Sequence, residues 1–175
     1  MADVSVRPAR PEDAERVARI QLSTWRTAYT FLPSDAIDVP EVQAAALWLR
    51  AIEVPPSPRH RLLVALEGPD LVGFAASGPT EDDDLDASTT TELTALVVDP
   101  RSGRRGHGSR LVAAAVEHWR GDGVSTATHW AWAQDTATRT FLVSAGWDRD
   151  GATRELDLGE RSERQVRFHT DVSSS

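Results

Sequence analysis

The segment from Thr91 to Arg120 constrains the fold of this 175-residue chain more than any other, because it joins three recognisable pieces in a fixed order. A β-type run, Leu93 to Val98, stops at Asp99-Pro100 and is followed by a turn, RSGRRGHGSR, with three glycines and four arginines. A helical stripe of apolar residues comes next. This order is typical of an anion-binding site, because the unpaired backbone N–H groups of the turn and of the first helical turn lie together at the positive end of the helix dipole. The pattern predicts a phosphorylated ligand at this turn, with a plain connecting turn as the alternative.

Two common phosphate-binding patterns do not fit the turn. The Walker pattern needs a Lys followed by Ser or Thr, and the chain contains no Lys. The dinucleotide pattern G-x-G-x-x-G is reversed here to G-x-x-G-x-G, and the acidic residue expected about 20 positions on is missing. Neither a P-loop nor a Rossmann site is therefore expected.

Composition bounds the class of protein. The length indicates one domain, expected over residues 1–170, with a loose tail over 171–175. A net charge of −8 argues against a nucleic-acid-binding surface, and the absence of cysteine excludes disulfides and a cysteine nucleophile. Without a long apolar run or a signal-peptide pattern, a cytoplasmic protein with no membrane contact is expected. The histidines lack metal-ligand spacing, so no metal site is predicted.

Apolar periodicity predicts a mixed sheet with helices, α/β or α+β in class. Helices are expected from Pro11 to about residue 32, from Glu41 to Ile52, after the glycine turn, and over 135–145. Strands are expected at Val4–Val6, 61–67, 71–77, 93–98, 124–132, from 147, and over 165–170. The acidic stretch 81–91 is interpreted as a solvated loop or, alternatively, as an electrostatic lure for a cationic ligand.

This order of elements resembles the GNAT superfamily of acetyl-CoA-dependent N-acetyltransferases. ELTALVVDP looks like the fourth strand of that family, and SGRRGHGSRL like its pyrophosphate loop, Q/R-x-x-G-x-G/A. TATRTFLVSAGW resembles a later family helix, and STWRTAYTFLPSD the first-helix region of a bacterial subset. The resemblance implies a mixed, mostly antiparallel sheet of about seven strands flanked by about four helices.

Three positions depart from the family pattern. The first loop position, usually Gln or Arg, is Gly103. The residue near the start of the later helix, usually Asn, is Asp135, which caps a helix equally well but donates no hydrogen bond when ionised. The Tyr that protonates the departing thiolate in many relatives is replaced by Leu142, so Tyr29 and Ser144 are the remaining candidates for that role.

The resemblance implies that an amine attacks the thioester of acetyl-CoA directly. Glu92, at the start of the fourth strand, is the candidate general base, with the end of the acidic loop as its alternative interpretation. A backbone N–H near Val97 would stabilise the developing oxyanion where the fourth strand splays from its neighbour.

The resemblance also assigns binding residues. The expected cofactor contacts lie on the fourth strand, the glycine turn and the later helix: Leu96, Val97, Val98, Arg104, Arg105, Gly106, His107, Gly108, Ser109, Arg110 and Asp135. Candidates for the acceptor site are Trp25, Tyr29, Trp130 and Trp132. The expected acceptor is a small cationic metabolite or antibiotic amine, and a homodimer is possible. The alternatives are acetylation of a protein N-terminus or lysine, and a non-catalytic acyl-CoA-binding module.

Overall fold

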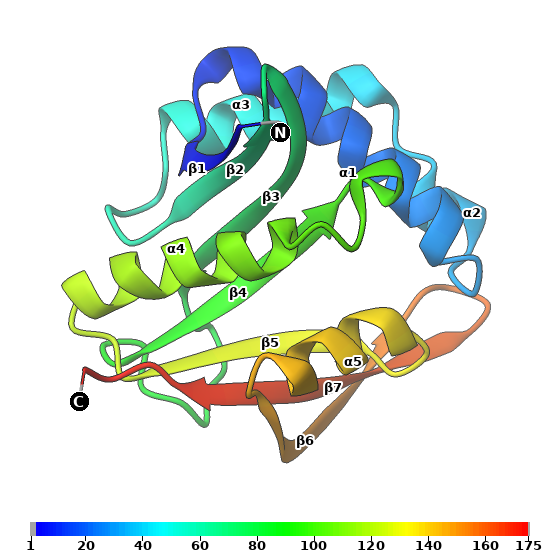
Figure 1. The fold of residues 1–175 in the computed structure, drawn as a ribbon. Coiled ribbons are helices and arrows are strands. Elements are labelled where there is room, and N and C mark those ends of the chain that lie inside the picture. The colour runs from blue at the N-terminus through cyan, green and yellow to red at the C-terminus, as the bar shows by residue number, and fades with distance from the viewer. Residues whose placement is uncertain (1–2, 175) are drawn as a thin grey trace.

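The computed structural model describes residues 3–174, which form one seven-stranded sheet with helices on both faces (Figure 1). The strands are β1 (Val4–Pro8), β2 (Arg61–Glu67), β3 (Asp70–Pro79), β4 (Thr90–Val98), β5 (Thr126–Trp132), β6 (Asp148–Asp157) and β7 (Ser162–Asp171). The α-helices are α1 (Ala14–Ala28), α2 (Ser34–Ile37), α3 (Glu41–Glu53), α4 (His107–Gly121) and α5 (Thr136–Ser144). Short 3-10 turns at Pro11–Asp13 and Pro100–Ser102 precede α1 and the glycine loop.

The sheet order is β1-β2-β3-β4-β5-β7-β6, and within residues 3–174 the pair β4–β5 is the single parallel one. That pair is short, because it joins residues 90–92 to 126–128 and then ends. Beyond this point the two strands diverge, as the ribbon shows (Figure 1). This opening between β4 and β5 lies in the middle of the sheet order. The strand of the fourth-strand motif, β4, forms one side of it.

Two apolar layers hold the helices to the sheet. One face packs against α4, where Leu111, Val112, Ala115 and Trp119 join strand residues in the larger cluster. On the opposite face α1 inserts Val17 and other apolar side chains against β2 to β4, and α3 covers α1. Because the amphipathic pattern of α1 and α4 matches the helical repeat, burial of one face fixes each helix on its side of the sheet.

The predicted fold class is confirmed, including the seven strands. There is one more α-helix than the expected four within the described residues, since a single turn, α2, forms after Pro33. The predicted loose tail starts too early. Asp171 belongs to β7, and the N–H of Val172 donates to the Ser125 carbonyl at 2.8 Å while its side chain is buried. Within residues 3–174, no helix is long and apolar enough to cross a membrane.

Candidate active site

The opening between β4 and β5 is shaped by an irregularity in β4. Ala76 pairs with Ala95, but the adjacent Ser77 pairs with Leu93, so Thr94 is an extra residue that bulges from the ladder. From Leu93 onward β4 has no ladder with β5. The backbone edge of β4 that faces β5 is therefore available to a ligand beyond the bulge.

Two cavities lie at the opening, one lined by the glycine turn and α5 and the other by residues of β5 and β7, and α1 contributes to both. The first, here called the glycine-loop groove, has a volume of about 470 Å³. Its walls come from α1, β4, the glycine turn and α5: Thr24, Ala28, Tyr29, Leu96, Val97, Val98, Gly103, Arg104, Gly106, His107, Gly108, Ser109, Asp135, Ala137, Thr138 and Phe141.

The glycine turn takes the conformation that an anion cradle requires. Gly106 has φ of 81° and immediately precedes α4, so the first N–H groups of a 15-residue helix open into the groove. A Cβ on Gly108 would lie 3.4 Å from the Phe141 ring, which shows how closely the turn packs on α5.

Glu67 of β2 holds the glycine turn in place through two of its side chains. Arg105 donates to both carboxylate oxygens of Glu67, at 2.9 and 3.0 Å, and the buried His107 ring lies 3.3 Å from the same group. Arg110 folds back onto the Arg105 carbonyl at 2.9 Å. These contacts leave Arg104 as the arginine of the turn that lines the groove.

Most of the predicted cofactor contacts meet at this groove. Leu96, Val97, Val98, Arg104, Gly106, His107, Gly108, Ser109 and Asp135 line it. Arg105 and Arg110 do not, because Glu67 and the backbone of the turn engage their guanidinium groups. The sequence shows the arginine cluster but not the carboxylate 38 residues earlier that redirects one of its members.

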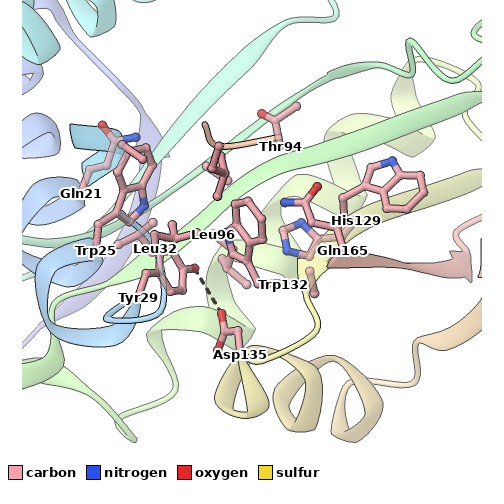
Figure 2. Close-up of a pocket in the computed structure, with 16 residues that line it drawn as sticks. Gln21, Trp25, Tyr29, Leu32, Thr94, Leu96, His129, Trp132, Asp135 and Gln165 are labelled. Atoms are coloured by element: carbon pink, nitrogen blue, oxygen red, sulfur yellow. Dashed lines mark hydrogen bonds between the residues drawn. The ribbon is translucent and has the colours of Figure 1, made fainter. Parts of the chain in front are cut away.

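The second cavity, here called the aromatic cavity, has a volume of about 310 Å³ and contains all four predicted acceptor-site residues. Figure 2 shows Trp25 and Tyr29 reaching in from α1, opposite Trp132 and Gln165 from β5 and β7. The other lining residues are Gln21, Leu32, Ala36, Thr94, Ala95, Leu96, Val97, His129, Trp130, Ala131, Asp135 and Leu158.

The two cavities meet at Tyr29, Leu96, Val97 and Asp135, which line both. The Tyr29 hydroxyl donates to Asp135 Oδ2 at 3.2 Å, the contact drawn in Figure 2. Burial, reinforced by the Asp135 charge, raises the pKa of the Tyr29 phenol well above its usual value, so the phenol stays protonated at neutral pH. Asp135 also caps α5, as predicted, by accepting from the Thr138 N–H at 3.0 Å.

Glu92 lies at the vertex of the opening, opposite Thr128 in the last paired position of β4 and β5. It is half-buried and lines neither cavity. Burial raises the pKa of its carboxyl group, and the nearby Asp82 adds to the rise. Any role in proton transfer to the shared edge therefore requires an intervening water.

His129 of β5 contacts β4 one residue beyond the last paired position of the two strands. It lines the aromatic cavity, which the sequence did not predict. Its Nδ1 lies 2.5 Å from the Leu93 carbonyl, and burial lowers the pKa of the ring. A neutral ring beside a carbonyl must carry its proton on Nδ1, so His129 donates across the gap where the ladder has ended.

Thr24 is another groove residue that the sequence analysis missed. Its Oγ1 is buried and has no hydrogen-bond partner in residues 3–174. A buried hydroxyl without a partner is costly, and a ligand amide or carbonyl in the groove would relieve that cost. Thr24 and Ala28 are four residues apart on α1, a helical spacing that could have suggested a shared face.

Comparison with known proteins identifies the family. The acetyltransferase (GNAT) family model matches residues 17–147, which contain both cavities apart from Leu158 and Gln165. The chain belongs to the GNAT acetyltransferase family. No curated protein sequence matches it.

Solved GNAT-family structures share its fold at low sequence identity. The yncA protein of Salmonella typhimurium, solved with its cofactor acetyl-CoA, has a TM-score of 0.74 at 17% identity and covers 99% of this chain and 96% of its own. PaiA N-acetyltransferase of Thermoplasma acidophilum, in complex with coenzyme A, has a TM-score of 0.70 at 14% identity, covering 97% and 99%. The ribosomal-protein-S18-alanine N-acetyltransferase of Escherichia coli has a TM-score of 0.69 at 16% identity, covering 99% and 96%.

The predicted family and the acyltransferase class are thereby confirmed for this GNAT protein. The structure also explains the departure at Leu142. Its side chain is completely buried among the residues that pack α5 and α4 on the sheet, so this position does not face either cavity. A proton donor for the thiolate must come from elsewhere if one is used.

Proposed function

We propose that this GNAT protein transfers the acetyl group of acetyl-CoA directly to a primary amine of a small molecule. The observation that carries the proposal is the junction of the two cavities at Tyr29, Leu96, Val97 and Asp135. A phosphorylated donor in the glycine-loop groove and an acceptor in the aromatic cavity would meet there, at the open backbone edge of β4.

The groove fits coenzyme A in three respects. The N-terminus of α4 behind Gly106 offers backbone donors and a positive dipole end to the diphosphate. The free edge of β4 at Val97 and Val98 can pair with an amide-containing arm as an added strand would. The unpartnered Thr24 hydroxyl lies on the opposite wall, within reach of such an arm.

Acetyl-CoA supplies an activated acetyl thioester, and the protein is left with three tasks. Glu92 accepts the ammonium proton through a water, a role supported by its raised pKa and its place at the vertex of β4 and β5. Backbone N–H groups near Val97 stabilise charge on the carbonyl oxygen, a contribution on the order of 3 kcal/mol for one such donor. Tyr29, a protonated phenol at the junction, turns its O–H from Asp135 Oδ2 to the departing sulfur and so replaces the proton donor that is missing at Leu142.

The walls of the aromatic cavity favour a small acceptor over a protein substrate. Leu32 and Ala36, from the α1–α2 region, line one side, and Leu158, after β6, lines it from the far end of the sheet. Figure 1 shows the β6–β7 connection curling towards the α2 region. A peptide would need an open groove at this place. Acetylation of a protein terminus or lysine is therefore the second candidate.

Calorimetry with coenzyme A and thiol release over a panel of amines test the proposal together. We expect acetyl-CoA to bind, and CoA to be released with at least one small amine. Gly108→Glu should weaken binding at least tenfold, because a carboxylate would face the diphosphate, whereas the matched Gly121→Glu at the far end of α4 should not.

Each failure has a distinct meaning. Absence of binding heat refutes the groove assignment. Binding without thiol release for any amine would indicate a non-catalytic acyl-CoA-binding module, and release with peptides alone would favour the protein substrate. The expected cytoplasmic location and homodimer stay predictions, tested by cell fractionation and light scattering.

A further inference from the structure

We propose that the acceptor is an amine with a single ammonium group and a flat apolar body, such as an aromatic ring, and not a polycation. The inference rests on the proposed function and specifies the class of its second substrate. It follows from what lines the aromatic cavity and from what occupies the carboxylates around it.

Four aromatic side chains line the aromatic cavity: Trp25, Tyr29, Trp130 and Trp132. Phe31 holds two of them, since its ring centroid lies 5.7 Å from that of Tyr29 and 6.0 Å from that of Trp132, the latter edge-on at 68°. These contacts pre-set the ring planes before a ligand enters. Aromatic walls at fixed angles favour a flat apolar body, through stacking and through the apolar area that both partners bury.

One carboxylate is available to an ammonium group in this cavity. Of the described residues that line it, Asp135 alone carries a carboxylate, and it lies at the end shared with the glycine-loop groove. Its Oδ2 already accepts from Tyr29 and from Thr138 Oγ1, at 3.2 and 2.6 Å, which fixes its orientation. An ammonium group paired with Asp135 would bring the amine nitrogen beside the open edge of β4 at Leu96 and Val97.

The acidic loop does not supply further carboxylates to the cavity. Arg167 of β7, whose side chain is 5% exposed, binds Asp82 at 3.0 Å and Asp84 at 2.6 Å, together with Asp150 at 2.6 Å. Trp130 donates to Asp82 at 3.0 Å, and the Arg154 guanidinium lies 4.3 Å from the centroid of its ring. Asp82, Asp84 and Asp150 are thus engaged by Arg167 and do not line the cavity, so the acidic loop offers no direct partner to a cation bound inside it.

Size points in the same direction. A volume of about 310 Å³ lies at the lower end of the range for small-molecule sites, roughly 300–1,000 Å³. An aminoglycoside or a long polyamine would leave several ammonium groups in an apolar cavity with one carboxylate. Burying an unpaired charge is strongly unfavourable, so these acceptors should be excluded.

The test compares amines that differ in one property. With acetyl-CoA saturating, we expect kcat/KM for 2-phenylethylamine to exceed that for n-butylamine, and to exceed those for spermidine and kanamycin at least tenfold. Trp132→Leu should lower kcat/KM for 2-phenylethylamine about tenfold more than it lowers kcat/KM for n-butylamine, while Trp132→Phe should retain most of the preference. Asp83→Asn, an exposed loop change, serves as the control and should alter neither.

Binding provides a readout that does not depend on turnover. In the presence of CoA, 2-phenylethylamine should quench tryptophan fluorescence and release heat on binding. Asp135→Asn keeps the α5 cap but removes the charge, and should weaken amine binding to the CoA-saturated protein about tenfold.

Three results would overturn the inference while leaving acetyl transfer intact: spermidine or kanamycin as the best acceptor, loss of their acetylation in Asp83→Asn, or unchanged amine binding in Asp135→Asn. If no amine of either kind releases CoA although CoA binds, the proposed function itself fails.

Discussion

Replacement of Gly106 by alanine tests the anion cradle directly. Gly106, the residue immediately before α4, has φ of 81°, in the left-handed region. An alanine Cβ would lie 3.4 Å from the Arg110 guanidinium, which is ordinary contact with a flexible side chain, so space is not the obstacle. The cost is conformational and amounts to about 1–2 kcal/mol for a non-glycine residue in that region.

That cost must appear in one of two places. If the substituted alanine keeps the left-handed conformation, the free energy of unfolding falls by about 1–2 kcal/mol and CoA affinity is preserved. If the turn relaxes, the stability of the free protein recovers but CoA binding weakens by about 5- to 30-fold, the same free energy. The unfolding free energy of the CoA-saturated protein should therefore drop by about 1–2 kcal/mol in either case.

Urea unfolding with and without saturating CoA, together with calorimetry, measures both quantities. Gly121→Ala is the matched control, since Gly121 ends the same helix with open space around it and no positive φ. Alanine is the better helix former there by about 0.5–1 kcal/mol, so this variant should be as stable as the parent or more stable, with unchanged affinity. If Gly106→Ala retains the stability of the parent CoA complex within about 0.3 kcal/mol, the reasoning about the left-handed residue is refuted.

Three further predictions concern proton transfer, acid stability and the core. Glu92→Gln should lower turnover and remove the acid limb of the kcat/KM profile, which the raised pKa of Glu92 places above the usual carboxyl range; an unchanged profile would exclude Glu92 as the base. The hydrogen bond from Arg101 holds the pKa of Asp99 below its usual value, so the folded state gains stability above about pH 4 and loses it as pH falls through the lowered value. Asp99→Asn should therefore flatten the acid limb of urea stability, and equal limbs would contradict this. Ser77→Ala removes the acceptor that the buried Trp119 Nε1 reaches at 3.1 Å, and should cost about 1–3 kcal/mol in urea unfolding; a cost below about 0.5 kcal/mol would mean that the indole N–H finds another partner.

Local patterns explain why much of the architecture was predictable. The helical period of α1 and α4, the cap at Asp135 and the glycines at 106 and 108 each depend on residues within a few positions. Most of the predicted cofactor contacts belong to these local motifs, and they line one groove. The sequence did not predict contacts between residues far apart in the chain. One example is the ion pair with Glu67, which holds Arg105 away from the groove.

The sequence by itself determined the glycine turn, the helices and strands that flank it, and the family to which they belong, because each depends on short-range conformational preference and on the order of motifs. Tertiary structure alone decided the charge and shape of the aromatic cavity. Arg167 engages Asp84, 83 residues away in the acidic loop, the bulge at Thr94 opens β4, and the end of α1 brings Tyr29 to Asp135 across 106 positions. Charge pairing and ring packing act through space, so chain position could not reveal which carboxylates line the cavity.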